Sequence, residues 1–175
     1  YDYWEHVFLP TLHQGLKLSD DAVQPTVVLR GFFPRGGGEV QVSSKPSLAT
    51  PFPPIVLNER GDISSIWIRS FYAGKCPRSV AQRMGEAAES HLKSQIPNVS
   101  ISTSVVFDEP AVASGSGILL VATTTTGCRF GGSALGSPKV SPHDVGVEAA
   151  TELRTALAEG GCVDDHLQDQ LILYM

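Results

Sequence analysis

The stretch Gly31 to Val40, which reads GFFPRGGGEV, is the part of the sequence that comes closest to a chemical motif. Gly31 and Gly36 have the spacing of a phosphate-binding loop, whose backbone N–H groups hold phosphate oxygens. That motif also needs a lysine that reaches the β- and γ-phosphates, and Gly37 stands at its position. The run lies between two strand-like segments, and glycine tolerates the positive φ angles of hairpin turns. We therefore predict a structural turn in preference to a nucleotide loop.

The other residues with catalytic or metal-binding potential form no generic motif. The sequence has no dinucleotide-binding GxGxxG after a strand, no GxSxG and no HExxH. No metal-ligand spacing relates the five histidines, which are His6, His13, His91, His143 and His166. An odd number of widely spaced cysteines favours reduced thiols over a disulfide framework or a zinc site; these are Cys76, Cys128 and Cys162.

The composition is that of a folded protein with one ordinary domain or two small ones. The chain has 175 residues, of which 42% are hydrophobic and 18% charged. The longest apolar runs are too short to span a bilayer, and residues 1–15 do not resemble a signal peptide, so we expect no membrane association. Eight basic residues face three acidic ones between Arg30 and Arg83, a balance of +5 within a chain of net charge −5. Such a stretch allows a basic face for an anionic partner, with ordinary surface charge as the alternative.

Hydrophobic periodicity predicts an α+β protein. After residue 59 the order β-α-β-β-β-α describes a compact unit of about one hundred residues. A proline-rich run at residues 44–54 cannot continue a central strand and indicates a linker. Gly160 and Gly161 end the last helix of the unit. The predicted helices are residues 1–18, with a kink at Pro10, 77–96 and 141–159; the predicted strands are residues 26–33, 38–44, 62–74, 98–108, 117–126 and 128–136.

The run from Arg30 to Val40 resembles the signature of the RNA 3′-terminal phosphate cyclase family. That signature is a basic residue, Gly, two free positions, Pro, one free position, three glycines, one free position and an aliphatic residue. Every fixed position is met, by Arg30, Gly31, Pro34, Gly36, Gly37, Gly38 and Val40. Four further segments look like the family in the same order: ERGDISSIWIRSFYAG, TTGCRFGGSALG, VGVEAATEL and GGCVDDHLQDQLILYM. The resemblance covers nearly all of the chain and about half of a family member.

The resemblance implies a division of the chain between two domains. Family members have a large catalytic domain of repeated α/β units and a smaller inserted α+β domain. Residues 1–58 and 162–175 would belong to the large domain, and residues 59–161 to the insert. The chain begins without an initiator methionine and stops within an apolar helical pattern, so we expect a piece of a longer protein.

The resemblance also implies an activity for the longer protein, in the ligase class. Family enzymes use ATP and a divalent metal, Mg²⁺ or Mn²⁺, to convert an RNA 3′-phosphate into a 2′,3′-cyclic phosphate. A histidine takes AMP and passes it to the RNA phosphate, and the neighbouring 2′-hydroxyl then displaces it. Adenylylation supplies the leaving group that a phosphate monoester lacks. The implied partner is RNA with a 3′-phosphate end and the implied location is the nucleoplasm, ahead of the cytoplasm, while the oligomeric state stays open.

A short helical segment near the end of the chain carries the candidate site. The family's adenylate site includes Tyr-Leu-x-Asp-Gln, and this chain has His166-Leu167-Gln168-Asp169-Gln170. Offsets of three and four residues put His166, Asp169 and Gln170 on one helical face. By resemblance Asp169 and Gln170 contact ATP, while His166 replaces the tyrosine; an ordinary polar face is the alternative.

The nucleophilic histidine of the family would lie beyond Met175. None of the five histidines matches its context, so we expect no catalytic residue in this chain and no activity of the chain alone. One alternative is a fragment of the family's non-catalytic relative, a factor in rRNA processing and ribosome biogenesis, although that relative looks degraded at the Asp-Gln segment that this chain keeps. Another is a free-standing RNA-binding module that uses the basic stretch.

Overall fold

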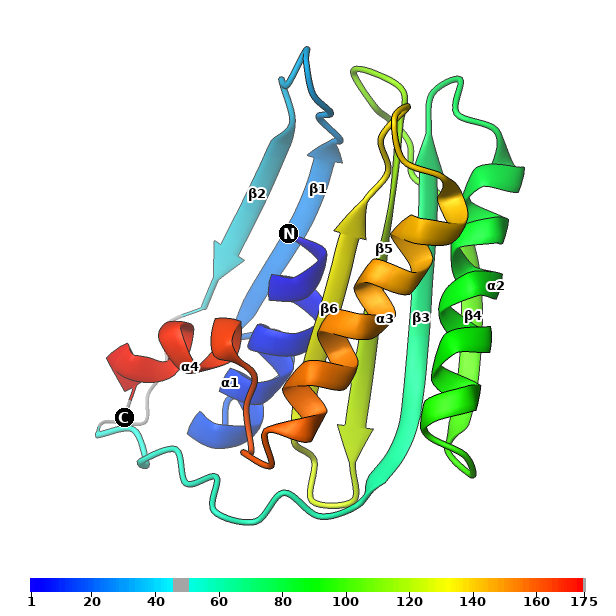
Figure 1. The fold of residues 1–175 in the computed structure, drawn as a ribbon. Helices are drawn as coiled ribbons and strands as arrows, with labels where there is room; N and C mark the ends of the chain where they lie inside the picture. The colour runs from blue at the N-terminus through cyan, green and yellow to red at the C-terminus, as the bar shows by residue number, and fades with distance from the viewer. Residues whose placement is uncertain (46–50, 175) are drawn as a thin grey trace.

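The computed structural model describes residues 1–45 and 51–174 (Figure 1). The N-terminal helix consists of a π-helical turn, η1 (Trp4–Phe8), and α1 (Leu9–Leu16). The remaining elements, in chain order, are β1 (Val23–Leu29), β2 (Glu39–Ser44), β3 (Ile63–Ala73), α2 (Arg78–Gln95), β4 (Ser100–Phe107), β5 (Gly115–Thr124), β6 (Arg129–Leu135), α3 (Pro142–Ala158), α4 (Asp165–Leu171) and the short 3₁₀ turn η2 (Ile172–Tyr174).

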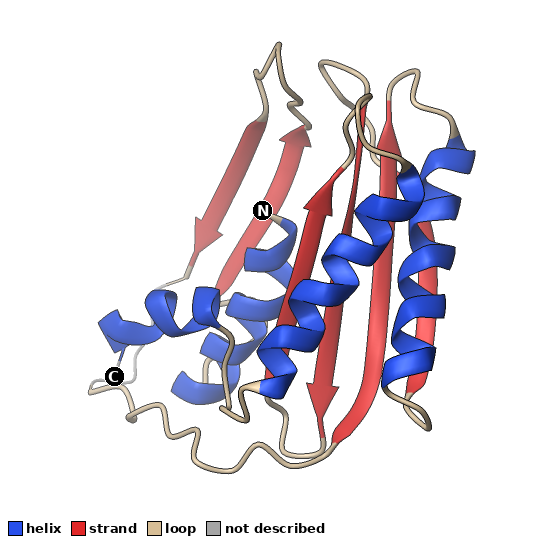
Figure 2. Cartoon of the chain, in the orientation of Figure 1, coloured by secondary structure: helices blue, strands red, loops and turns tan. Residues whose placement is uncertain are grey.

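A four-stranded sheet in the order β4-β3-β5-β6 organises the larger part of the chain. β3 runs parallel to β4, and the β3–β5 and β5–β6 pairs are antiparallel. Because parallel neighbours need a crossover, α2 leaves the end of β3 and returns over the sheet to β4. Figure 2 shows α2 and α3 side by side on one face of this sheet. The predicted α+β class and the order β-α-β-β-β-α are confirmed.

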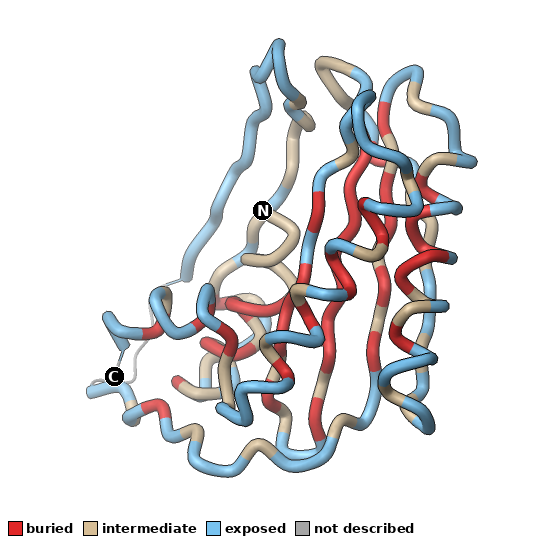
Figure 3. The backbone as a smooth tube through the Cα atoms, in the orientation of Figure 1, coloured by how far each residue is buried: buried red, intermediate tan, exposed pale blue. Residues whose placement is uncertain are grey.

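The main core lies between that sheet face and the two helices. The predicted apolar stripe of α3 is buried at Val145, Ala149, Leu153 and Leu157. It packs with α2 side chains against strand residues that include Phe130. Figure 3 shows buried residues along both helices and along the strands behind them. The layers approach closely at glycines, where a side chain has no room. A Cβ at position 132 would lie 2.5 Å from the Ala149 carbonyl oxygen, and one at position 146 would lie 2.2 Å from the Met84 carbonyl oxygen.

The N-terminal helix and α4 cover the opposite face of the sheet. Val7 and Leu12 are buried there against Leu119 and Val121 of β5, together with Leu167 of α4. β5 is therefore covered on both faces, which explains its nearly continuous apolar sequence. The predicted N-terminal helix is confirmed. The expected kink at Pro10 coincides with a change from π- to α-helical winding, because η1 ends at Phe8 and Pro10 is the second residue of α1.

β1 and β2 form a separate antiparallel hairpin, with Val27 opposite Val40. The predicted structural turn is confirmed: Gly36 and Gly37 have φ angles of 62° and 73°, and the Gly36 N–H donates to the Phe32 carbonyl oxygen at 2.9 Å. β1 ends at Leu29, four residues earlier than predicted, because the next residues leave the ladder and approach the loop after β4.

The segment between β2 and β3 contains no helix or strand among its described residues, 45 and 51–62. The rest of the predicted linker, residues 46–50, lies outside the described residues. Ile55 in this segment is buried against the N-terminal helix, so part of the connection packs on the fold. Within the described ranges, no helix has both the length and the apolar character needed to cross a membrane.

Candidate functional site

The position of α4, which carries the candidate site, is set by the buried carboxylate of Asp164. As the N-cap of α4, Asp164 accepts a hydrogen bond from the Leu167 N–H at 2.8 Å. It also accepts one from the Gly131 N–H of β6 at 2.7 Å and one from the Tyr3 hydroxyl. Burial raises the pKa of Tyr3, and the hydrogen bond to Asp164 raises that pKa further, so Tyr3 stays a donor. One side chain thus joins α4 to the sheet and to the N-terminal helix.

His166 is turned toward α3. Its Nε2 atom lies 3.2 Å from Oε1 of Glu152, whose other carboxylate oxygen accepts from the Ser133 N–H at 2.7 Å. The imidazole also packs against the Tyr3 ring in a T-shaped arrangement, with 5.6 Å between the ring centroids. His166 is therefore exposed but held by neighbours.

Asp169 and Gln170 follow on the same helix in different environments. Asp169 is exposed, with its carboxylate in solvent. Gln170 is half-buried, and its Oε1 atom is buried without a hydrogen-bond partner among the residues that the structure describes. An amide oxygen removed from water without a donor costs about 1–3 kcal/mol. α4 thus carries all three predicted residues, and Gln170 is the one of the three with a buried, unpartnered polar atom.

A second polar cluster, which the sequence did not reveal, surrounds the signature residue Arg30. Its guanidinium donates two hydrogen bonds to the Asp2 carboxylate, at 2.6 and 2.7 Å, and lies 3.0 Å from Asp108. Arg69 on β3 completes the cluster at 2.6 Å from Asp108 and 3.2 Å from Asp2. Both guanidinium groups lie over the Phe71 ring, 5.2 and 5.0 Å from its centroid. We call these four charged side chains the Arg30 cluster.

The Arg30 cluster is a closed, electrically balanced set of charges. Burial opposes the ionisation of Asp2, but its bonds with Arg30 and the charge of Arg69 outweigh burial and hold the pKa of Asp2 below its ordinary value. Burial likewise opposes the charge of Arg30, but Asp2 outweighs it and raises the pKa of Arg30. The Arg30 backbone also pairs with the loop after β4, donating to Pro110 and accepting from Val112. The cluster therefore joins the hairpin to the N-terminal helix and the sheet.

Comparison with known proteins identifies the family. Residues 58–158 match the insert domain of RNA 3′-terminal phosphate cyclase. A probable RNA 3′-terminal phosphate cyclase of Dictyostelium discoideum is 33% identical over 177 residues, which cover 99% of this chain and 40% of the relative.

The chain belongs to the RNA 3′-terminal phosphate cyclase family. An RNA 3′-terminal phosphate cyclase of Caldivirga maquilingensis is 36% identical over 166 residues, 94% of this chain and 46% of that protein. An rRNA processing protein of Schizosaccharomyces pombe is 33% identical over 168 residues, 95% of this chain and 46% of that protein. The chain spans less than half the length of these relatives. The predicted domain boundaries, at residues 58/59 and 161/162, stay predictions.

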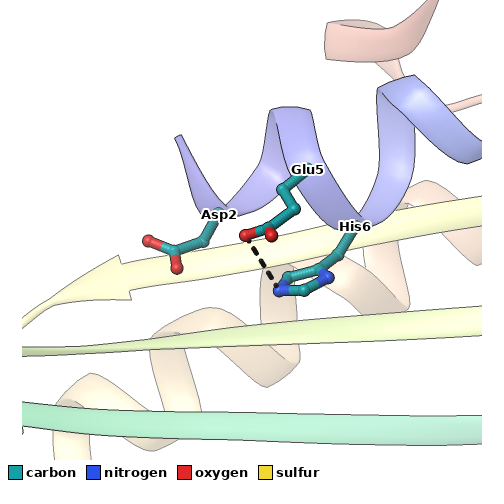
Figure 4. A group of neighbouring side chains, drawn as sticks. All are labelled: Asp2, Glu5 and His6. Carbon is teal, nitrogen blue, oxygen red and sulfur yellow. Dashed lines mark ion pairs between the residues drawn. The ribbon is translucent and has the colours of Figure 1, made fainter. Parts of the chain in front are cut away.

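One group of three side chains in the described part of this family member has metal-ligand geometry. Atoms of Asp2, Glu5 and His6 lie within 4.8 Å of one another (Figure 4). Both carboxylate oxygens of Asp2 are already held by Arg30. Burial lowers the pKa of His6, whose ring packs edge-on against Trp67 with 4.9 Å between the centroids. Mg²⁺ and Mn²⁺ prefer several free oxygen ligands, so this group does not fit the divalent metal that the family implies.

Proposed function

We propose that the parent protein, meaning this chain within a protein of the relatives' full length, is an ATP-dependent RNA 3′-phosphate cyclase of the ligase class. The observation that carries the proposal is the polar side of α4. This chain belongs to the family and has Asp169 and Gln170 there, and the Oε1 atom of Gln170 lacks a hydrogen-bond donor. In this proposal the divalent metal that the reaction needs is bound by residues other than Asp2, Glu5 and His6.

The residues of α4 suit the nucleoside end of ATP. The Gln170 amide has an oxygen that accepts from an exocyclic amino group and an NH₂ group that donates to a ring nitrogen. The exposed Asp169 carboxylate accepts from a ribose hydroxyl and, being negative, is unsuited to phosphate. The AMP group of ATP supplies the leaving group that a 3′-phosphate monoester lacks. In this proposal the chain orients the nucleoside, and the histidine that takes AMP belongs to the rest of the parent protein, so the chain alone does not cyclise RNA.

His166 has a positioning role in this proposal. Its contacts with Glu152 and the Tyr3 ring fix the imidazole at the start of α4, one helical turn before Asp169 and Gln170. A flat ring held there offers a face on which a purine can stack.

The substrate is RNA with a 3′-phosphate end, and nuclear RNA processing is the setting that the eukaryotic relatives favour.

A role in rRNA processing without catalysis is the second candidate. The observation in its favour is the rRNA processing protein of S. pombe, which matches 95% of this chain at 33% identity. The retained Asp169–Gln170 pair favours the enzyme. The two candidates differ in one measurable property, since only the enzyme reacts with ATP.

Labelling with ATP tests the proposal. The parent protein incubated with ATP labelled in its α-phosphate should become covalently labelled. Gln170→Ala and Asp169→Ala should each reduce the labelling rate at limiting ATP about tenfold or more, as expected for a lost ligand hydrogen bond of about 1.5 kcal/mol. Gln168→Ala, which changes an exposed residue of the same helix, should label normally.

Two results would overturn parts of this proposal separately. Normal labelling of both Gln170→Ala and Asp169→Ala removes α4 from the ATP site. Absence of labelling in the parent protein itself, with folding verified, removes the enzyme and leaves the rRNA processing role.

A further inference from the structure

A groove of about 780 Å³ opens at the end of the molecule where four connections gather. These are the loops at residues 30–38, 73–77, 108–115 and 135–141, which Figure 1 shows together beyond the ends of the strands. The groove volume is within the range of small-ligand sites. Its lining is mainly apolar and includes Phe32, Phe33, Val80, Leu135, Val140 and Val145.

The most exposed part of this groove is an aromatic ring. Phe33 is 95% exposed, although the neighbouring Phe32 is held against the sheet, where a Cβ at position 115 would lie 2.1 Å from its ring. Leu135, which also lines the groove, is 75% exposed. Exposed apolar residues that line one groove are typical of a binding surface. Phe32 anchors the turn, and Phe33 presents a flat ring to solvent.

Three cationic side chains belong to the loops that form the groove. Lys75 lines it, and Lys139 stands between two lining residues, Pro138 and Val140. Arg35 follows Phe33 in the turn, and all three cations are exposed and make no ion pair within the described ranges.

Three of the acidic side chains near this end are hydrogen-bonded or ion-paired, while Glu39 at the start of β2 is exposed. Both Glu109 oxygens accept backbone N–H groups, from Gly74 at 2.7 Å and from Ala111 at 3.0 Å. Asp108 belongs to the Arg30 cluster, and Asp144 caps α3 with Ser141. The N-terminal ends of α2 and α3 also point to this end of the sheet and add positive potential. The groove therefore combines an apolar lining with exposed cationic side chains on the loops that form it.

We propose that this groove binds a single-stranded segment of RNA. Phe33 stacks on one base, and Arg35, Lys75 and Lys139 bind the phosphates on either side of it. This is the chemistry of single-strand recognition, in which aromatic rings take bases and a cationic track takes the backbone without strong sequence preference. The inference rests on the proposed function, because RNA is the substrate there, and it assigns to the groove the part of the RNA away from the reacting end.

The first test measures stacking. The chain is titrated into a fluorescein-labelled 12-nucleotide single-stranded RNA with a 3′-hydroxyl end, without ATP, and fluorescence anisotropy gives the affinity. Phe33→Ala should weaken binding about 5- to 100-fold, the range that loss of one stacked base spans. The matched control is Phe52→Ala, which removes another exposed aromatic side chain. It lies in the connection that leads into β3, which Figure 1 shows running along the opposite end of the molecule.

The second test measures the phosphate contacts. For single strands, the slope of log affinity against log salt changes by about 0.7 for each phosphate contact. Lys75→Gln and Lys139→Gln should each make that slope shallower by about this amount. Lys93→Gln removes the same charge near the other end of α2, where Lys93 pairs with Glu89, and should leave the slope unchanged.

The outcomes separate this inference from the proposed function. If Phe33→Ala and Lys75→Gln bind RNA as tightly as the unchanged chain, the groove is not the RNA site, whatever the result of ATP labelling. If the chain binds no RNA and instead self-associates through Phe33 in sedimentation experiments, the groove is a protein-docking surface and the inference is overturned. Phe33-dependent binding supports the groove even if the parent protein fails to react with ATP.

Discussion

Replacing Arg30 by alanine tests the account of the signature arginine as a structural residue. The side chains of Arg30 and Asp2 are each 14% exposed, and those of Arg69 and Asp108 are 12% and 9% exposed. The substitution removes one of two positive charges and leaves two carboxylates and one guanidinium in a nearly closed cluster. It also removes three of the short contacts that connect the hairpin to the N-terminal helix and the sheet.

The expected cost follows from this geometry. Removing one partner of a buried ion pair costs about 3–5 kcal/mol, because the other charge stays buried without compensation. Arg69 still lies 2.6 Å from Asp108 and 3.2 Å from Asp2, so it continues to neutralise both carboxylates in part. We therefore expect a loss of about 3 kcal/mol in the free energy of unfolding, near the lower limit of that range. For a chain of this size that loss lowers Tm by about 6–12 °C.

Thermal and urea unfolding, followed by circular dichroism, measure this loss. Arg35→Ala is the matched control, because Arg35 lies in the same turn but is exposed; its effect on the free energy of unfolding should stay within about 0.5 kcal/mol.

The pH dependence of the stability difference gives a second criterion. Since the folded-state pKa of Asp2 is below its ordinary value of 3.8, the stabilisation is complete above that value and is lost as the pH falls through the lower, folded-state pKa. The difference between the two proteins should therefore be full at pH 7 and shrink below about pH 3.8. A Tm for Arg30→Ala equal to that of Arg35→Ala would refute the reasoning.

Two further substitutions test how α4 and α3 are held. Tyr3→Phe leaves Asp164 without one of its buried donors and should lower the free energy of unfolding by about 1–3 kcal/mol in urea titrations, whereas an unchanged value would contradict the role of Asp164 as the anchor of α4. Gly132→Ala places a Cβ 2.5 Å from the Ala149 carbonyl oxygen and should cost about 1–3 kcal/mol by the same measurement, with an unaltered stability arguing against the close approach of β6 and α3.

Local patterns predicted most of the elements. The four apolar positions of α3 recur every four residues, so they identify a helix and its buried face without tertiary information. The glycines from Gly36 to Gly38 between two strand patterns likewise predicted the hairpin, and Gly36 and Gly37 indeed have positive φ. The ends of the elements were predicted less accurately, because contacts between distant segments decide them. Arg30, for example, leaves the β1 ladder and pairs with the loop after β4.

The arrangement of charged side chains was beyond sequence reasoning. The Arg30 cluster unites residues 2, 30, 69 and 108, and no local spacing relates positions so far apart in the chain. Similarly, the helical offsets placed His166 and Gln170 on one face, but only the packing shows that His166 faces Glu152 while Gln170 keeps a buried, unpaired oxygen. One local signal does identify Asp164 from the sequence, because an aspartate immediately before a helical segment is a typical N-cap.

The most direct test of the central claim is conversion of an RNA 3′-phosphate end by the parent protein. An RNA labelled at its 5′ end and carrying a 3′-phosphate is incubated with ATP and Mg²⁺ or Mn²⁺, and resistance of the end to phosphatase reports the cyclic phosphate. The account predicts an ATP-dependent, phosphatase-resistant product, formed about tenfold or more slowly by Gln170→Ala at limiting ATP and normally by Gln168→Ala. An end that stays sensitive to phosphatase, or a Gln170→Ala protein as active as its parent, would contradict it.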